Sequence, residues 1–167
     1  MTEIYNGKKI IAVSNSAERE TDLLKKIIRD SGRSSVFEVV PADEAVQRGL
    51  RATVLLAQEP PKAVESESLP VFVTKFLPER EKIEDSRNII TYSTEWDGAD
   101  FTARNVRALP DGVTAFEIVG VGIIGRVHLA RGCSDDVEAA LAAAATATAA
   151  GIPFAEALGA LNEPEKA

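Results

Sequence analysis

A short polar loop between a predicted strand and a predicted helix carries the residues best placed to do chemistry. The segment "KKIIAVSNSAERETDLLKKIIRDSG", residues 8–32, gives an apolar β-branched run, a polar loop and then an amphipathic helix that ends at Gly32. This order is typical of a phosphate-binding loop, where backbone N–H groups and a lysine hold an anion at a helix N-terminus. The glycines and the Gly-Lys-Ser/Thr signature of such a loop are missing. The segment therefore has the order of elements of a nucleotide site without its usual chemistry.

The charges around this loop work against a bound polyphosphate. Glu18, Glu20 and Asp22 surround the start of the helix, and Arg19 stands among them as a single cation. A helix dipole is worth about 0.3–1 kcal/mol to an exposed anion. Two unit charges about 4 Å apart interact by roughly 4 kcal/mol at an effective dielectric constant of about 20. Repulsion by one close carboxylate outweighs the dipole, so we expect the carboxylates to stabilise the helix and disfavour a nucleotide.

Few other side chains offer catalytic or metal-binding chemistry. Cys133 is the only cysteine and His128 the only histidine, which excludes an internal disulfide and a Cys-based zinc site. A His-metal cluster or a Ser-His-Asp triad is not expected either. His128 could act as a base and Cys133, near Arg131, as a reactive thiolate, but a surface strand histidine and a packed cysteine are the simpler interpretations. We predict no catalytic residue and no metal site.

The segment "EWDGAD" places three carboxylates and a tryptophan close together in the sequence, at Glu95, Trp96, Asp97 and Asp100. Paired carboxylates could bind a cation. The simpler interpretation is that Asp97 and Gly98 form a turn and that Trp96 fills a gap in the packing.

The composition indicates one acidic globular domain that covers residues 1–167. Hydrophobic residues make up 45% and charged residues 27% of the chain, and the net charge is -7. A negative chain without a Lys/Arg stripe is not expected to bind nucleic acid or an anionic membrane. The polar start "MTEIYNGKK" lacks a signal peptide, and the longest apolar stretch is too short to span a bilayer. We therefore expect a cytoplasmic protein.

The first half of the chain alternates strands with helices. A helical stripe starts near Ala17, with Asn15 or Ser16 as its expected cap, Glu18 in a capping-box position and Gly32 as its end. A short helix is predicted at residues 42–49. Strands are predicted at residues 9–14, 35–40, 52–57, 71–76 and 88–93. Strands that alternate with helices imply a parallel sheet with crossover helices, and the Pro/Glu/Ser-rich residues 58–70 are predicted to be a loop.

The second half changes to an antiparallel pattern. The runs "FTARNVRAL", "VTAFEIVG" and "IIGRVHLAR" are separated by the turn signals "PDG" and "GVG". Two helices follow; Ser134 or Asp135 is expected to cap the first, Gly151 to end it and Pro153 to open the second. Residues 162–167 are expected to fray. The predicted fold class is therefore α/β, a P-loop-like parallel sheet with crossover helices plus an antiparallel β-meander and two C-terminal helices.

The two ends of the chain together resemble the ATP-binding central domain of the Mur ligase family, whose members join amino acids to the peptidoglycan stem peptide. Family members open this domain with a strand, the loop Thr-Gly-Thr-Asn-Gly-Lys-Thr-Thr and a helix, where this chain has "VSNSAERETDLLKKIIRDSG". They close it with Gly-x-x-Asn-Val-x-Asn-Ala-Leu-Ala-Ala and a further helix, where this chain has "GCSDDVEAALAAAATATAAGIPFAEAL". The resemblance covers roughly residues 8–57 and 88–161.

By position, the resemblance matches the two loop glycines of the family to Asn15 and Glu18. It matches the lysine to Arg19 and the magnesium-holding hydroxyl to Glu20, and an asparagine near the adenine falls at Ala139. The family's N-terminal and C-terminal domains have no counterpart in this sequence. Neither do its magnesium-binding Glu and His or its modified Lys, so the chain resembles a trimmed, single-domain relative.

These features lead to the hypothesis of a non-catalytic Mur ligase-like module with a role in interaction or regulation, linked to cell-wall peptide synthesis. Its loop would be vestigial, without a bound cofactor, and a protein partner or a homo-oligomer would cover faces that other domains cover in the family. One alternative is an ATP- and magnesium-dependent amide ligase that works with separately encoded domains. Another is a small-ligand binder that uses the carboxyl ends of the strands. The vestigial loop comprises Asn15, Ser16, Ala17, Glu18, Arg19, Glu20 and Thr21.

Overall fold

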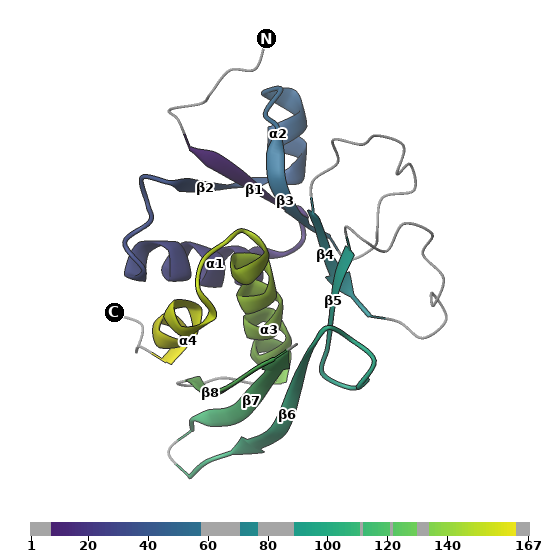
Figure 1. The fold of residues 1–167 in the computed structure, drawn as a ribbon, viewed down its shortest axis with the longest axis vertical. Coiled ribbons are helices and arrows are strands. Elements are labelled where there is room, and N and C mark those ends of the chain that lie inside the picture. The colour runs from purple at the N-terminus through teal and green to yellow at the C-terminus, as the bar shows by residue number, and fades with distance from the viewer. Residues whose placement is uncertain are drawn as a thin grey trace.

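The described strands form one continuous mixed sheet, which has a parallel part and an antiparallel part. The computed structural model describes residues 8–57, 71–76, 89–110, 112–120, 122–129 and 134–162. Their strand order is β2-β1-β3-β4-β5-β6-β7-β8 (Figure 1). The strands are β1 (Lys9–Val13), β2 (Phe37–Pro41), β3 (Ala52–Leu56), β4 (Val71–Lys75), β5 (Ile89–Ser93), β6 (Phe101–Ala108), β7 (Thr114–Gly120) and β8 (Ile123–Leu129).

The sheet confirms the predicted α/β class with its parallel strands and its meander. Strands β2, β1, β3, β4 and β5 are parallel to their neighbours, and β6, β7 and β8 form antiparallel pairs. The two parts join where β5 pairs in parallel with β6, with Tyr92 opposite Phe101. The sequence pattern did not indicate this junction, because it predicts each part but not how the parts meet.

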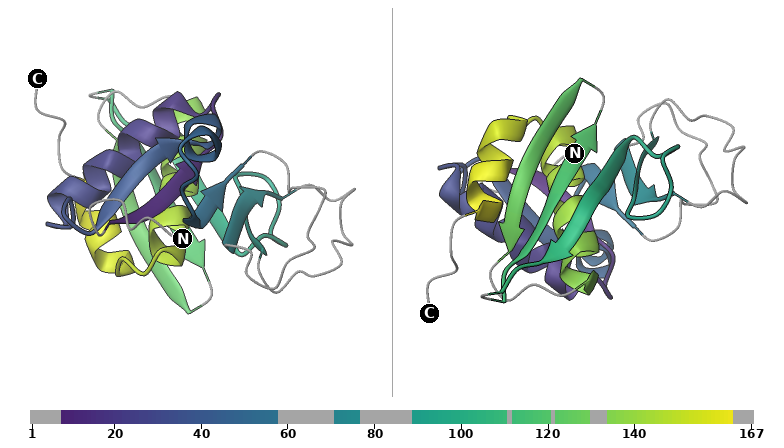
Figure 2. Two further views of the ribbon diagram at one scale, coloured as in Figure 1. Left: turned by 90° about the horizontal axis from the view of Figure 1, so that it is seen from above. Right: turned by 90° about the horizontal axis from the view of Figure 1, so that it is seen from below.

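Three of the described helices cover one face of the sheet, and a fourth, which is short, covers part of the other. The helices are α1 (Glu18–Asp30), α2 (Ala42–Gln47), α3 (Ser134–Ala149) and α4 (Phe154–Asn162). Helix α3 lies at the centre and packs against α1, α4 and strands β3 to β7, whereas α2 packs against β1 and β2 (Figures 1 and 2). The alanine-rich run of α3 from Ala139 to Ala145 is almost completely buried. Small side chains let this helix lie close to its neighbours on all sides, as is typical of a core helix.

The helix ends follow the glycine signals, but the start of α1 does not follow the predicted cap. Gly32 has a φ of 74°, and its N–H donates to the carbonyl of Arg29, so it closes α1 as expected. Gly151 closes α3 in the same way with a φ of 103°. The N-cap of α1 is Ala17, without a side-chain cap. The prediction that Asn15 or Ser16 caps α1 is therefore wrong.

Helix α4 is held by contacts at its two ends. The carboxylate of Glu156 in its first turn pairs with Arg33, and the carbonyl of Ala160 near its end accepts a hydrogen bond from the buried ammonium of Lys26. Pro153 precedes the helix, and its carbonyl accepts the first N–H groups. Asn162, which the sequence pattern assigns to a frayed tail, is the last helical residue.

Some sequence predictions fall on residues outside the described ranges. They are the loop at residues 58–70 and the packing of Cys133 near Arg131. In the part of the chain that the structure describes, no helix is long and apolar enough to cross a membrane.

Candidate functional site

The candidate loop lies at the carboxyl end of β1, where the backbone already uses part of its hydrogen-bonding capacity. The N–H of Ser14 donates to the carbonyl of Leu56 in β3 at 2.8 Å. The N–H of Ala17 turns back to the carbonyl of Ser14 at 3.0 Å. A phosphate-binding loop instead directs successive backbone N–H groups toward the anion. These two N–H groups of the loop are therefore engaged within the protein.

The backbone conformation of the loop also differs from that of a glycine-containing cradle. Such a cradle alternates right-handed and left-handed residues, and glycine supplies the left-handed ones. Among the described residues other than glycine, only Asn105 in β6 has a positive φ, of 56°. Asn15 and Glu18, the positions matched to glycines, thus have ordinary backbone conformations. The loop lacks the left-handed residue that an anion nest contains.

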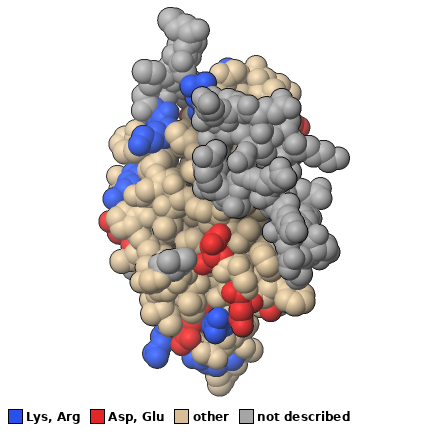
Figure 3. All heavy atoms as spheres, turned by 45° about the vertical axis from the view of Figure 1, so that its right-hand side comes forward, with Lys and Arg blue, Asp and Glu red and all other residues tan. Residues whose placement is uncertain are grey.

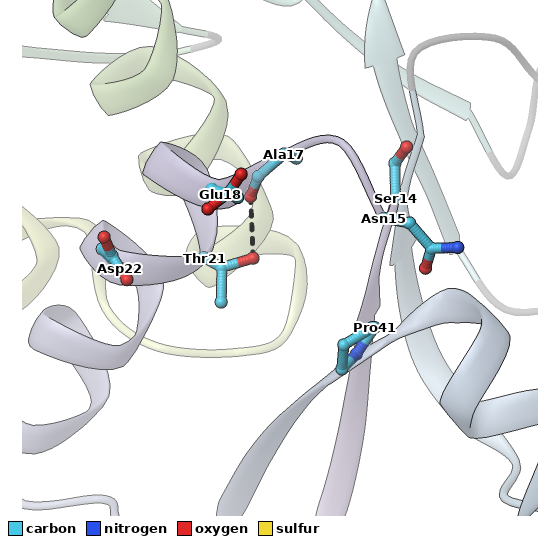
Figure 4. A pocket seen from close by; sticks show the side chains of 7 residues that line it. All are labelled: Ser14, Asn15, Ala17, Glu18, Thr21, Asp22 and Pro41. Atoms are coloured by element: carbon cyan, nitrogen blue, oxygen red, sulfur yellow. Dashed lines mark hydrogen bonds between the residues drawn. The ribbon is translucent and has the colours of Figure 1, made fainter.

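A hollow of about 170 Å³ lies between the loop, the first turns of α1 and the end of β2 (Figure 4). Two of its lining side chains, Glu18 and Asp22, are carboxylates four residues apart on α1. Thr21 donates its hydroxyl to the carbonyl of Ala17 at 2.8 Å. The lining residues are Ser14, Asn15, Ala17, Glu18, Thr21, Asp22 and Pro41. The hollow therefore offers carboxylates where a phosphate site would offer donors and positive charge.

Asn15 connects the loop to α2 rather than to α1. Its side-chain amide donates to the carboxylate of Asp43, and its side-chain oxygen accepts the backbone N–H of Asp43 at 3.2 Å. Helix α2 begins after Pro41, which has no side-chain cap of its own. Asn15 thus accepts an N–H in the first turn of α2, and these hydrogen bonds attach the loop to α2.

Arg19, the cation of the loop, is paired with the first turn of α3. Its Nε lies 3.0 Å from Oδ1 of Asp136, and the two side chains are 38% and 21% exposed. Lys75 at the end of β4 makes a similar contact with Glu138, at 3.1 Å. The positive charges at this edge of the sheet are therefore matched by carboxylates of α3.

Tyr92, near the carboxyl end of β5, is buried close to two carboxylates. Burial raises the pKa of the Tyr92 hydroxyl above its ordinary value of 10, and the carboxylates of Glu138 and Glu20 raise the pKa further. Glu20 lies in the first turn of α1, and Glu138 lies near the start of α3. Burial is the larger cause of the pKa shift, and the two carboxylates add a smaller effect in the same direction.

The other candidate residues have structural contacts. His128 is exposed on β8, in agreement with the surface interpretation. Asp100 accepts the backbone N–H and the hydroxyl of Thr91, and Asp97 pairs with Arg104 at 3.2 Å. Trp96 is 47% exposed, so the prediction that it fills a gap is wrong. Within the described ranges, no group of three or more His, Cys, Asp or Glu residues is placed to hold a metal ion.

Comparison with solved structures identifies the fold. MurF from Acinetobacter baumannii superposes with a TM-score of 0.66 and 15% identity over 97% of this chain and 47% of that chain. A pseudomurein peptide ligase type C from Methanothermus fervidus gives 0.66 and 14%, over 96% and 50%. MurF from Thermotoga maritima in complex with ADP gives 0.67 and 13%, over 96% and 49%. No protein-family model and no curated protein matches the sequence.

The α/β sheet and these superpositions define the chain as a Mur ligase-like domain in its fold. The chain spans about half the length of the ligases that it resembles. The resemblance stated from the two ends of the sequence is thereby confirmed at the level of the fold.

Proposed function

We propose that this chain is a non-catalytic Mur ligase-like module that does not bind a nucleotide at the β1–α1 loop. It acts through interaction or regulation, in connection with cell-wall peptide synthesis. The observation that carries the proposal is the pairing of Arg19 with Asp136, next to a hollow lined by Glu18 and Asp22. Arg19 is already paired with a carboxylate of the protein itself. The hollow near it is lined by two carboxylates, which would repel a phosphate.

A nucleotide with magnesium is the cofactor that the fold implies, and the residues present do not fit it. Glu18 stands where the family has a glycine, so both its Cβ and its carboxylate occupy space that phosphate oxygens would need. Glu20 stands where the family has the hydroxyl that holds magnesium. The N–H of Ala17 is engaged with the carbonyl of Ser14. These features support a loop that has kept its position in the fold without its ligand.

A thermal-shift measurement tests this proposal. A ligand that binds only the folded state stabilises it by about 2.7 kcal/mol at a concentration of one hundred times Kd. We expect Mg-ATP to change the melting temperature of neither the wild-type chain nor the control variant Arg19→Ala. A saturable rise in melting temperature that Arg19→Ala abolishes would contradict the proposal.

An ATP-dependent amide ligase that works with separately encoded domains is the second candidate. The observation that favours it is Arg19, which keeps a positive charge in the first turn of α1. For this function, Arg19 would replace the lysine, and Arg19→Ala would have to abolish amide formation by the assembled parts. A small-ligand binder at the carboxyl edge is tested by a thermal-shift screen of cell-wall precursors.

We further infer that the module works with a protein partner or as a homo-oligomer in the cytoplasm. Support comes from large apolar side chains that are exposed in the described part of the chain, such as Val46 at 80% and Ile124 at 67%. Light scattering at several concentrations measures self-association. A chain that is monomeric at every concentration would exclude the homo-oligomer.

A further inference from the structure

The outer face of the meander carries a regular array of side chains. Strand register places nine residues in three rows of three across β6, β7 and β8, on the side opposite to α3 and α4. The alternate residues, such as Phe116, Ile118 and Val127, are buried in the core on the helix side. The rows are Thr102, Val119 and Ile124; Arg104, Glu117 and Arg126; and Arg107, Ala115 and His128. We call this set the outer array.

None of the described helices covers the outer array. Figure 2 shows the three strands of the meander in front, with the helices behind them, when the molecule is seen from below. Thr102 and Ala115 are buried, so the exposed surface of the array consists mainly of its arginines, Ile124 and His128. The side chain of Arg126 is 78% exposed, and Ile124 is 67% exposed. Helix α2, on the same side of the sheet, packs against β1 and β2 at the other end.

The outer array is cationic although the chain is acidic. It holds Arg104, Arg107 and Arg126 against Glu117, which gives a surplus of two positive charges, while the chain carries -7. Even when Asp97, the partner of Arg104, is included, a positive surplus remains. Figure 3 shows basic and acidic side chains interleaved at the lower end of the molecule, where Figure 1 places β6 and β7.

Glu117 lies at the centre of the array and is held by its neighbours, and the arginines lie around it. The carboxylate of Glu117 accepts a hydrogen bond from Nδ2 of Asn105 at 2.9 Å and lies 3.9 Å from Nε of Arg126. Arg107 donates to the carbonyl of Asn105 at 3.0 Å. The bulge at Asn105 therefore organises the middle of the array, and exposed guanidinium groups surround it.

A second copy of the chain is a poor occupant of this face. In a symmetric face-to-face dimer centred on Glu117, with the two-fold axis along or across the strands, Glu117 of one chain faces Glu117 of the other. The same operation sets the arginines of the middle row against arginines. Like charges across an interface cost several kcal/mol, so a face-to-face dimer is disfavoured.

A nucleic acid is a poor occupant as well. The array spans only a few residues in each direction, and the Debye length is about 8 Å at physiological ionic strength. A long polyanion would extend over the acidic remainder of the chain. The exposed Ile124 beside Val119 adds an apolar position that a phosphate backbone does not use.

From these observations we propose that the outer array is a docking surface for an acidic protein partner whose carboxylates surround an aliphatic side chain. Carboxylates of the partner would face Arg104, Arg107 and Arg126, and its aliphatic group would face Ile124. Arg–carboxylate pairs of this kind set orientation and the rate of association. The inference rests on the proposed interaction role and assigns that role to one surface.

The test uses a labelled synthetic peptide that repeats Glu-Glu-Leu, followed by fluorescence anisotropy with the whole chain. We expect binding at low salt that weakens as salt rises. The variant Arg104→Glu/Arg107→Glu/Arg126→Glu should lose about tenfold or more in affinity. The matched control Lys25→Glu/Arg29→Glu/Arg51→Glu makes the same charge change on exposed residues elsewhere and should retain binding within about threefold. An Arg→Gln version of the first variant serves if the charge reversal disturbs folding.

Three outcomes would overturn the docking surface. They are no binding of the peptide to the chain, equal loss of affinity in both sets of variants, and equally tight binding of single-stranded DNA. Ile124→Ser should weaken the Glu-Glu-Leu peptide but not a Glu-Glu-Ser peptide, and a uniform effect on both would remove the apolar part. A chain that binds neither Mg-ATP nor the peptide would refute this surface and leave the proposed loss of nucleotide binding intact.

Discussion

The guanidinium of Arg19 lies 3.0 Å from the carboxylate of Asp136, although the two residues are 117 positions apart in the chain. The pair joins the first turn of α1 to the first turn of α3, the two helices that pack side by side against the sheet. Arg19, the position that the sequence resemblance matches to the lysine of the family, thus forms an ion pair that links two packed helices.

The energy of this ion pair is measurable by a double-mutant cycle. Arg19→Ala and Asp136→Asn are each expected to lower the free energy of unfolding by up to about 1 kcal/mol, because both groups are partly exposed. Urea denaturation of the two single variants and the double variant gives the coupling. Arg29→Ala is the control, since Arg29 pairs only with its neighbour Asp30 among the described contacts. A coupling no larger than the error would show that the pair does not hold the helices together.

Gly125 of β8 lies directly against α4, so a side chain at this position is expected to displace Leu158. A Cβ at Gly125 would come within 2.1 Å of Cδ1 of Leu158. Gly125→Ala should therefore destabilise the chain by about 1–3 kcal/mol, and Leu158→Ala in the same chain should restore part of that loss. Gly159→Ala is the matched control on α4, where a Cβ would meet nothing within 4 Å. It should be neutral or stabilise by about 0.5–1 kcal/mol, and destabilisation by both glycine variants would contradict the packing described.

Asn162 is expected to protect the edge of β8, which is the last strand of the sheet among the described residues. Its amide donates to the carbonyl of Arg126 at 2.9 Å and accepts the N–H of His128 at 2.7 Å, as a neighbouring strand would. Asn162→Ala would leave the edge of β8 open, and exposed edges pair with other chains. We expect a loss of about 1 kcal/mol in stability and a concentration-dependent increase in mass by light scattering. Asn162→Asp keeps an acceptor for His128 but sets a carboxylate oxygen against the carbonyl of Arg126, so it should not rescue this loss.

Tyr92 is expected to make the fold sensitive to alkali. Its pKa is raised in the folded state, so the unfolded chain binds fewer protons than the folded chain above pH 10, the ordinary pKa. This contribution to stability is complete below pH 10 and is lost as the pH rises toward the folded pKa. Melting temperatures from pH 8 to pH 11.5 should fall more steeply for the wild-type chain than for Tyr92→Phe. Parallel curves would show that the buried hydroxyl is not responsible.

The sequence was sufficient for the elements of the fold because each element carries a local signal. Period-two and period-3.6 patterns located the strands and helices, and Gly32 and Gly151 marked two helix ends through their positive φ. The boundaries moved by one or two residues, as expected when hydrogen bonds rather than patterns define them.

The contacts that shape the site were not predictable in the same way, since they join distant segments. Asn15 has the side chain of a helix cap and lies before α1, but it satisfies Asp43 of α2. Asn162 looked like the start of a polar tail, and its role depends on β8 lying alongside α4. Local sequence signals identify the capacity of such a residue to hydrogen-bond, and tertiary packing selects its partner.

Isothermal titration calorimetry of the chain with Mg-ATP tests most directly whether the β1–α1 loop has lost its nucleotide. We expect no saturable heat up to millimolar nucleotide, because Arg19 is paired with Asp136 and carboxylates line the hollow. Micromolar binding with one nucleotide per chain, abolished by Arg19→Ala, would contradict the proposed loss of nucleotide binding.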